Sequence, residues 1–250
     1  MRVVETTQGL FKVGVPEGYI NFDRKDNVDW IDFQLANRGQ FSAIHTWIVD
    51  EFLTEDSVVV DVGAHIGTFT IPAAKKAKIV HSFEPVIQSF LRLTEHIEMN
   101  GVSNVTPHNF ALGDSLTSAE IECMPLFNTG AAKLNISRGA LIFRGLGDEH
   151  EPPKYRMLVK TLDSLDLPVI DFLKCDTEGC ELLVVRGAIE TIKKCRPVMV
   201  LEHNYIAERD EVLKVLADAG VPYGCKVIRD PSLDEEIEST DFLYEPLEKH

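Results

Sequence analysis

The stretch 58-VVVDVGAHIGTFT-70 decides how the chain folds and where we expect its ligand. A run of β-branched apolar residues, typical of a buried strand, meets an acid and then two glycines four positions apart. Glycines permit the tight turn by which a chain leaves such a strand and enters a helix beside a ligand. Some proteins make this turn for a dinucleotide, others for a different adenosine compound, and others for packing alone. The rest of the sequence has to distinguish these cases.

The composition is that of an ordinary soluble globular protein, and 250 residues suffice for one large α/β domain. The net charge of −15, from 40 acidic and 25 basic residues, repels polyanions, so we expect no nucleic-acid substrate. The sequence shows no apolar run long enough to span a membrane and no basic-then-apolar start, so we expect a cytoplasmic protein. Five cysteines without a C-x-x-C pair argue against a disulfide framework and a zinc ribbon.

The pattern along the chain predicts a parallel sheet covered by helices on both faces. Residues 1–56 read as an N-terminal extension of the same unit, with strands at 11–15 and 19–22. A helix follows that places Phe41, Ile44, Ile48 and Phe52 on one face. From residue 57 to 250, nearly continuous apolar strands alternate with helical segments. We expect strands at 58–62, 79–83, 105–110, 119–124, 156–160, 169–175, 198–202, 224–228 and 242–244, and helices at 68–77, 86–100, from 181, and at 209–219. The segment at about 125–154 is long enough to be a lid or a binding loop.

Polar residues gather where the predicted parallel strands end. In an open parallel sheet, ligands bind outside the carboxyl ends of the strands, so these residues mark the expected site. In strand order they are Asp61, then Glu84, then Asn109, then Lys174, Asp176 and Glu178, then Glu202, His203 and Asn204.

The opening stretch reads D-x-G-x-x-x-G and lacks the third glycine of the dinucleotide fingerprint G-x-G-x-x-G. Asp61 suits a ligand with a cationic group near the turn, and the carboxylate of Glu84 suits two ribose hydroxyls. A ribose without a pyrophosphate, joined to a charged amino acid, describes S-adenosylmethionine. The alternative is that Asp61 caps the helix and Glu84 is a solvated strand end. We expect His65 to contact the cofactor rather than to act chemically.

A second cluster of charged residues lies in 173-LKCDTEGCELLVVRGA-188. Glu178 or Glu181 could simply favour a helix N-terminus. That explanation does not extend to Lys174 and Asp176, which alternate with apolar residues on a strand expected to be buried. A buried charge must be paired or functional, so these two residues pair with each other or with Glu202 on the neighbouring strand.

Taken together, these motifs resemble the FkbM-type class I methyltransferases, which use S-adenosylmethionine and mostly methylate hydroxyl oxygens. The resemblance covers about residues 57 to 204 and is most specific in the block K-x-D-x-E-G-x-E. The matching segments are DVGA (61–64) with Gly67, FEP (83–85), NFALGD (109–114), KTLDSL (160–165), FLKCDTEGCE (172–181), RGA (186–188), RP (196–197) and LE (201–202).

The resemblance implies a Rossmann-like fold with a mostly parallel seven-stranded sheet. It also implies a cofactor site, in which Glu84 holds the ribose and Phe110 and Ala111 line the adenine. The residues expected to surround the rest of the cofactor are Asp61, Gly63, Ala64, His65, Gly67, Thr68 and Pro85. His65 departs from the family, which commonly has Asn at this position.

For the chemistry, we expect Asp176 or Glu178 to be the base or the substrate-orienting carboxylate, with Lys174 as electrostatic partner. Glu202 and His203 are second choices for the base. Asp176, Glu202 and Asn204 could together hold Mg²⁺. The acceptor is expected to be a hydroxyl of a small molecule or saccharide. The alternatives are an NAD-dependent oxidoreductase on a similar sheet and a non-catalytic module that binds an adenosyl ligand.

Overall fold

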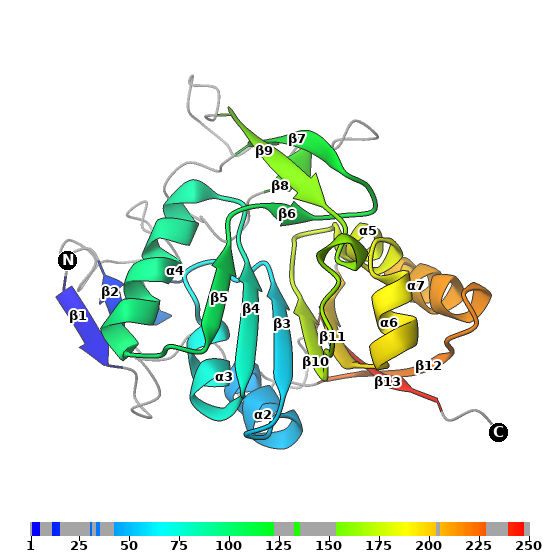
Figure 1. Ribbon diagram of the computed structural model, residues 1–250, viewed down its shortest axis with the longest axis horizontal. Coiled ribbons are helices and arrows are strands. Elements are labelled where there is room, and N and C mark those ends of the chain that lie inside the picture. Colours follow the sequence, from blue (N-terminus) through cyan, green and yellow to red (C-terminus); the bar gives the residue numbers. More distant parts are fainter. Residues whose placement is uncertain are drawn as a thin grey trace.

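A seven-stranded sheet forms the centre of the molecule, as predicted (Figure 1). The computed structural model describes residues 2–5, 12–15, 31, 34–35, 43–122, 133–135, 154–203, 206–228 and 240–247. The strand order is β12-β13-β11-β10-β3-β4-β5, and β13 runs antiparallel to both of its neighbours. The strands are β3 (Val58–Val62), β4 (Ile79–Phe83), β5 (Val105–His108), β10 (Phe172–Cys175), β11 (Val198–Glu202), β12 (Tyr223–Val227) and β13 (Asp241–Pro246).

The strand order reverses between β3 and β10. From β3 the chain proceeds outward through β4 to β5, and it later crosses back to place β10 on the other side of β3. The loops that follow β3 and β10 therefore lead away from each other. Open α/β sheets bind ligands in the crevice between two such loops, outside the carboxyl ends of the strands.

Helices cover both faces of the sheet. Alternate residues of its strands point to opposite faces and pack into two separate hydrophobic cores. Val60, Leu173 and Leu201 pack with α5 (Glu181–Arg186), α6 (Ile189–Cys195) and α7 (Ile206–Asp218). On the opposite face, Val59, Phe172 and Val200 pack with α2 (Ala43–Phe52) and α3 (Thr70–Lys76). A further helix, α4 (Ile87–Asn100), ends at Gly101 in the left-handed conformation, as expected for a C-cap glycine.

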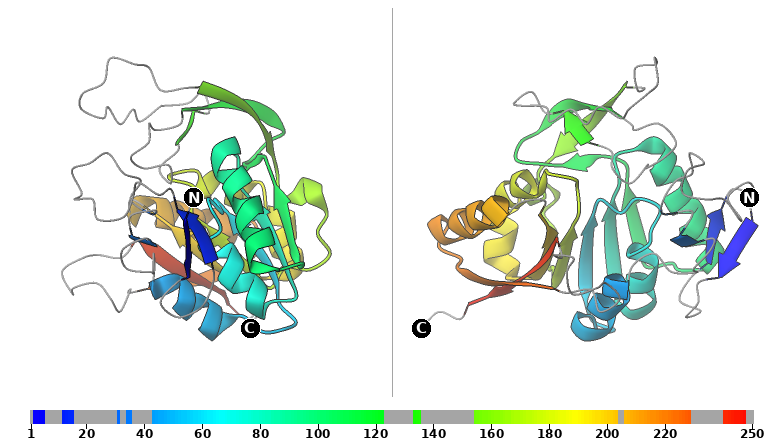
Figure 2. Two further views of the ribbon diagram at one scale, coloured as in Figure 1. Left: turned by 90° about the vertical axis from the view of Figure 1, so that its left-hand side faces the viewer. Right: turned by 180° about the vertical axis from the view of Figure 1, so that it is seen from behind.

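A second sheet lies beyond the carboxyl ends of the central strands (Figures 1 and 2). Its order is β6-β9-β7-β8, formed by β6 (Ala111–Leu112), β9 (Lys154–Lys160), β7 (Thr117–Glu122) and β8 (Lys133–Asn135). The sequence predicted β7 and β9 as strands but not this separate sheet. Of the predicted loop at about 125–154, Lys133–Asn135 forms β8 and Lys154 opens β9, and the rest lies outside the described residues.

The N-terminal region contributes two paired strands and a helix that belongs to the core. β1 (Arg2–Glu5) and β2 (Lys12–Val15) are antiparallel, whereas the predicted strand at 19–22 lies outside the described residues. In α2, Ile44 and Ile48 are buried against the sheet and Phe52 is half-buried beside them, as predicted; Phe41 lies outside the described residues. No helix in the described ranges is long and apolar enough to cross a membrane.

Candidate active site

One face of the sheet changes from apolar to charged as its strands approach their carboxyl ends. Val59, Phe172 and Val200 are buried beneath α2 and α3. Because side chains alternate along a strand, the residues two positions further on share this face. They are Asp61, Lys174 and Glu202, and the register adds Asp241 opposite Glu202 and places Lys174 opposite Asp61. The predicted polar residues of β3, β10 and β11 thus meet where the strand order reverses.

Lys174 and Asp176 form the predicted ion pair, with 3.0 Å between Lys174 Nζ and Asp176 Oδ2. The lysine side chain is 4% exposed and the aspartate side chain 31% exposed. Burial alone would lower the pKa of Lys174, but the charges of Asp176 and Asp61 raise it above its usual value. Burial would likewise raise the pKa of Asp176, and Lys174 instead holds it well below its usual range. Both groups are therefore ionised at neutral pH, and the carboxylate end of the pair is the one that faces water.

Glu202 sits beside this pair in the opposite protonation state. Its Oε1 accepts a hydrogen bond of 3.0 Å from the hydroxyl of Thr240. Burial and the negative charge of Asp176 raise the pKa of Glu202 to about 9. At neutral pH Glu202 is thus a carboxylic acid next to an ionised carboxylate, which is the arrangement expected when two neighbouring carboxyl groups share a site.

Glu181 organises the loop that follows β10. Its carboxylate accepts hydrogen bonds from the backbone and the hydroxyl of Thr177, both at 2.7 Å, and from the backbone of Gly179 at 3.1 Å. Gly179 and Glu178 both have positive φ angles, of 106° and 57°, which Glu178 adopts despite its side chain. Glu181 is therefore structural, as the helix N-terminus interpretation suggested, whereas Glu178 is half-buried in the loop next to Asp176.

The glycine turn after β3 packs directly against the end of β10. Gly63 has φ 83°, and a Cβ at this position would overlap the carbonyl oxygen of Asp176. Gly67 has φ 94°, and a Cβ there would lie 2.9 Å from a methyl group of Leu93. Both glycines are thus required by the turn and by its neighbours, and Gly63 fixes the distance between the turn and Asp176. Ala64 is buried in this turn, and His65 is a non-glycine residue with positive φ, at 49°.

Asp61 lies beneath the turn and is fully buried. Its Oδ2 accepts a hydrogen bond of 2.5 Å from Thr70, whose hydroxyl also lies 3.0 Å from that of Ser82. Its Oδ1 has no hydrogen-bond partner among the described residues. Burial raises the pKa of Asp61 above its usual value. This carboxylate therefore anchors α3 through Oδ2, while its Oδ1 still has acceptor capacity.

Glu84 ties the glycine turn to the end of β4. Its two carboxylate oxygens accept hydrogen bonds of 2.8 Å from the backbone N–H groups of His65 and Val86. Burial raises the pKa of Glu84 to about 7. Glu84 is therefore not a solvated strand end. Each of its oxygens has used one lone pair, so each can still accept a second hydrogen bond, for example from a ribose hydroxyl.

The residues expected at the adenine end follow β5. The amide nitrogen of Asn109 donates to the backbone oxygens of Glu84 and Pro85, at 2.9 and 3.2 Å, and so joins the ends of β4 and β5. The ring of Phe110 is half-buried, packs edge-on against Phe83, and has Lys160 Nζ 4.4 Å from its centroid. Ala111 is buried at the start of β6.

His203, a candidate base, is buried and packs beside Tyr244. Its Nε2 lies 2.8 Å from the Tyr244 hydroxyl, and burial lowers the pKa of His203 to about 4. His203 is 2% exposed and its Nε2 is engaged with Tyr244, whereas the Asp176 carboxylate reaches water, so Asp176 becomes the stronger candidate. Asn204, the third expected magnesium ligand, lies outside the described residues. Within the described ranges, no group of three or more His, Cys, Asp or Glu side chains is arranged to hold a metal ion.

His45 on α2 reaches the same cluster, although it belongs to none of the sequence motifs. The residue is 8% exposed, and its electrostatic neighbours include Lys174 and Asp176. The available signal was its position one residue after Ile44 and three before Ile48 on a helix expected to face the sheet. Asp241 was missed as well, because only the antiparallel pairing of β13 with β11 brings it beside Glu202.

Three of the sequence motifs turn out to have structural roles away from the charged cluster. The carboxylate of Asp163, in KTLDSL, accepts the backbone N–H groups of Glu190 and Thr191 at the start of α6. Gly187, in RGA, approaches Gly113, in NFALGD, so closely that a Cβ would overlap the carbonyl oxygen of Gly113. These segments hold α6 and the second sheet in place rather than contacting Asp176.

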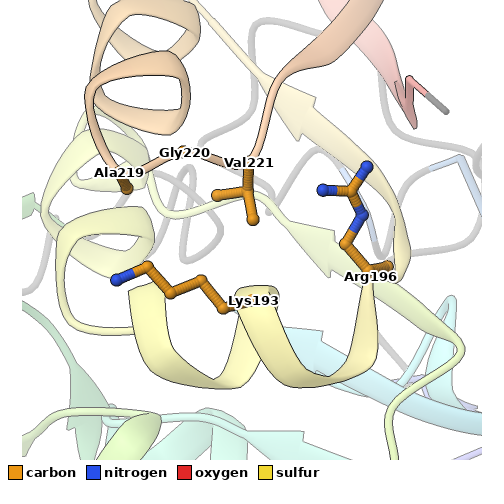
Figure 3. Close-up of a pocket in the computed structure, with 5 residues that line it drawn as sticks. All are labelled: Lys193, Arg196, Ala219, Gly220 and Val221. Atoms are coloured by element: carbon orange, nitrogen blue, oxygen red, sulfur yellow. The ribbon is translucent and has the colours of Figure 1, made fainter. Parts of the chain in front are cut away.

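A pocket of ≈ 580 Å³ lies at the other edge of the sheet, between the end of α6 and the turn from α7 to β12 (Figure 3). Lys193, Arg196, Ala219, Gly220 and Val221 line it. Both cations already have partners: Lys193 pairs with Glu190 at 2.8 Å, and Arg196 donates to the backbone oxygen of Leu247. Because α6 and α7 lead into the amino ends of β11 and β12, this pocket is separate from the charged cluster.

Comparisons with known proteins agree with the geometry. The chain is 30% identical over 165 residues to the hexuronic acid methyltransferase AglP of Haloferax volcanii, a match that covers 66% of this chain and 63% of that protein. It is 27% identical over 147 residues to methyltransferase 1 of Beauveria bassiana, covering 53% of this chain and 59% of that one. The chain thus spans less than two thirds of the length of these relatives.

A solved structure and a family model complete the comparison. The crystal structure of the FkbM methyltransferase from Methylobacillus flagellatus KT superposes with a TM-score of 0.52 at 17% identity, over 76% of this chain and 44% of that one. This likeness supports the Rossmann-like methyltransferase fold. The model of the methyltransferase FkbM domain matches residues 61–238, which contain the glycine turn, β10 and β11. The chain therefore belongs to the FkbM methyltransferase family.

Proposed function

We propose that the protein is an S-adenosylmethionine-dependent O-methyltransferase that acts on a hydroxyl of a saccharide. The observation that carries the proposal is the Lys174–Asp176 ion pair, whose carboxylate faces water at the reversal point of the sheet beside the glycine turn. Family membership and the similarity to a protein named as a hexuronic acid methyltransferase support the reaction and the class of acceptor. Neither the oxidoreductase nor the binding-module alternative gains support from these matches.

The residues around the turn fit the cofactor. Asp61 retains a buried oxygen without a partner among the described residues, and Glu84 retains acceptor capacity on both oxygens. Asp61 and the turn would hold the amino-acid portion, Glu84 the ribose, and Phe110 with Ala111 the adenine. The cofactor supplies an electrophilic methyl group. The protein has to exclude water, align the acceptor oxygen and accept its proton.

Asp176 is the carboxylate that we assign to the acceptor hydroxyl. The hydroxyl donates a hydrogen bond to Asp176, which orients an oxygen lone pair for attack. As the new O–C bond forms, the bond between the methyl group and the sulfonium sulfur would break and leave its electron pair on sulfur, while the hydroxyl proton would pass to Asp176. A carboxylate with a lowered pKa is a weak base, so Asp176 accepts the proton when the oxygen has become positively charged, and no alkoxide forms beforehand. Lys174 keeps Asp176 ionised, and Glu202, holding its own proton, does not compete for this one.

The charge of the site favours a hydroxyl over a carboxylate as the acceptor. A hexuronic acid carries both groups. The cluster contains four carboxyl groups around one ammonium group, that of Lys174. The carboxyl groups belong to Asp61, Asp176, Glu202 and Asp241, and they interact electrostatically with Lys174 or with one another. An anionic acceptor group next to Asp176 would be repelled. We therefore expect an ether product rather than a methyl ester.

Magnesium remains a prediction. Asp176 and Glu202 lie together, but Lys174 already neutralises Asp176 at 3.0 Å, so the acceptor can be oriented without a cation. Activity that survives EDTA and is not raised by Mg²⁺ would remove the metal from the mechanism.

The test is a methyl-transfer screen over neutral and uronic-acid saccharides and small hydroxylated molecules, read by mass. The expected product gains one methyl group that resists mild alkali, as an ether does. An alkali-labile product would show a carboxyl acceptor instead. If the protein binds S-adenosylhomocysteine and methylates none of these acceptors, the binding-module alternative is favoured, and if it binds no adenosyl ligand, the cofactor assignment is wrong.

A further inference from the structure

Helix α2 lies outside the region matched by the family model, which begins at residue 61, yet it forms one wall of the charged cluster. Ile44, Ile48 and Val49 anchor the helix in the core beneath the sheet face that carries Lys174. This anchoring fixes the depth and rotation of α2, and it buries His45 to 8% exposure. The family match therefore does not account for this residue, and its position calls for a separate explanation.

His45 connects the glycine turn to the ion pair. Its ring packs edge-on against Phe69, with 5.6 Å between centroids, and it forms a hydrogen bond with the backbone of Thr68. Phe69 also contacts Lys174, whose Nζ lies 5.8 Å from the centroid of the Phe69 ring. Lys174 in turn donates to Asp176 at 3.0 Å. A continuous series of contacts thus runs from α2 through the start of α3 to the proposed base.

The chemical nature of the imidazole suits this place. Burial and the neighbouring charge of Lys174 lower the pKa of His45 to about 3, so the ring is neutral in the working range. A neutral ring adds no positive charge next to Lys174. The Lys174 side chain beside it is 4% exposed, and an ion pair shielded from water is electrostatically stronger. A lysine or arginine at this position would compete for Asp176, and a small residue would admit water.

We propose that His45 is a positioning residue of the methyl-transfer site, which acts through Phe69 and Lys174 to hold Asp176 toward the acceptor. The kinetic part of this inference rests on the proposed function, whereas the structural part does not. His45 is not assigned a proton-transfer role.

The kinetic test compares His45→Phe and His45→Gln with Thr46→Ala, a control on the same helix. His45→Phe keeps an aromatic ring against Phe69 but loses the hydrogen bond to Thr68, and His45→Gln retains a donor. We expect His45→Phe to lower kcat on the order of 10-fold to 100-fold through misplacement of Asp176, with KM and the Kd for S-adenosylhomocysteine within about 2-fold of wild type. His45→Gln should recover part of the loss, and Thr46→Ala should match wild type. A folded His45→Phe protein with unchanged kcat would overturn the proposal.

A spectroscopic test needs no acceptor and separates this inference from the proposed function. A buried, hydrogen-bonded ammonium exchanges its protons slowly, so Lys174 should give a resolved ¹H–¹⁵N signal that Lys174→Met removes. We expect this signal to broaden or shift in His45→Phe and to stay in place in Thr46→Ala. An unaltered signal in His45→Phe would contradict the proposal even if the enzyme proves active. Failure of wild type to transfer methyl groups would instead count against the proposed function alone.

Discussion

Lys174 and Asp176 form one ion pair, but the two side chains differ in exposure, at 4% and 31%. Removing the aspartate leaves a buried ammonium without its main partner, whereas removing the lysine leaves a carboxylate that water can still reach. Breaking a buried pair from one side costs about 3 to 5 kcal/mol. The two halves of the pair should therefore make unequal contributions to stability.

We accordingly expect Asp176→Asn to lower the free energy of unfolding by about 3 kcal/mol and Lys174→Met to lower it by less. The double variant Lys174→Met/Asp176→Asn should be more stable than the sum of the single losses implies, because neither charge is left alone. Urea denaturation of the four proteins measures this cycle. Strictly additive losses would show that the pair is not coupled in the folded protein.

Glu84 introduces a pH dependence whose sign follows from its environment. The ordinary pKa of a glutamate is 4.5, and burial raises that of Glu84 to about 7. Between these two values the folded protein binds a proton that the unfolded chain has released. Stability therefore falls as the pH rises through this window and levels off above it, with a contribution of about 3 kcal/mol.

The corresponding variant is Glu84→Gln, which cannot titrate. Its unfolding free energy should change less between pH 4.5 and 7 than that of wild type, whatever its absolute stability. Thermal or urea unfolding across this range provides the comparison. Parallel curves for the two proteins would mean that Glu84 has an ordinary pKa and is more solvated than the structure shows.

At the scale of the single element, the turn between β3 and α3 depends on glycine for two separate reasons. Gly63 has a positive φ, and it also leaves no room for a Cβ beside Asp176. Gly101, at the end of α4, has φ 64° and nothing within 4 Å of the position of a Cβ. The comparison of these two glycines separates backbone strain from steric overlap.

Gly101→Ala should cost about 1 to 2 kcal/mol, the price of left-handed backbone for an L-residue. Gly63→Ala should cost distinctly more than that and should weaken binding of S-adenosylhomocysteine, because β10 and the turn must move apart. Denaturation and calorimetric titration of both variants test the difference. Equal losses in stability, with full binding by Gly63→Ala, would show that the turn and β10 adjust freely.

The elements that the sequence predicted best are those buried on both faces. The bounds of β3, β4 and β11 are as predicted, because continuous apolar runs closed by polar residues leave little ambiguity. β10 was predicted from Val169 but begins at Phe172, since Val169 is exposed and Asp171 instead accepts the backbone N–H of Val58. The strand predicted to end at Phe110 ends at His108, because Ala111 pairs with Val159 in the second sheet. Such pairing across distant segments leaves no local sequence signal.

The candidate site shows the same division between local and distant information. The pairing of Lys174 with Asp176 followed from two charges on one buried strand, and the structure confirms it. The shared environment of Asp176 and Glu202 required the order of β10 and β11, and the place of His45 required the packing of α2. These depend on how elements that are distant in the sequence pack together, which no local sequence pattern encodes.

For the molecule as a whole, the net charge of −15 bears on what the protein can bind. Nucleic-acid binding relies on neutralising phosphates, and this chain has 25 basic against 40 acidic residues. We expect no measurable affinity for single- or double-stranded RNA at physiological salt. Fluorescence anisotropy with labelled RNA at low and physiological salt measures this. Tight binding that weakens steeply with salt would reveal a basic surface and reopen a nucleic-acid acceptor.

We propose that Asp176, held by Lys174, receives the acceptor proton during methyl transfer. The most direct test of this role is single-turnover transfer of a labelled methyl group to the best saccharide acceptor by wild type and Asp176→Asn, with cofactor affinity measured on the same samples. We predict that Asp176→Asn binds S-adenosylhomocysteine within about 3-fold of wild type while its transfer rate falls on the order of 100-fold to 10,000-fold. Transfer at the wild-type rate by a folded Asp176→Asn protein would contradict the account.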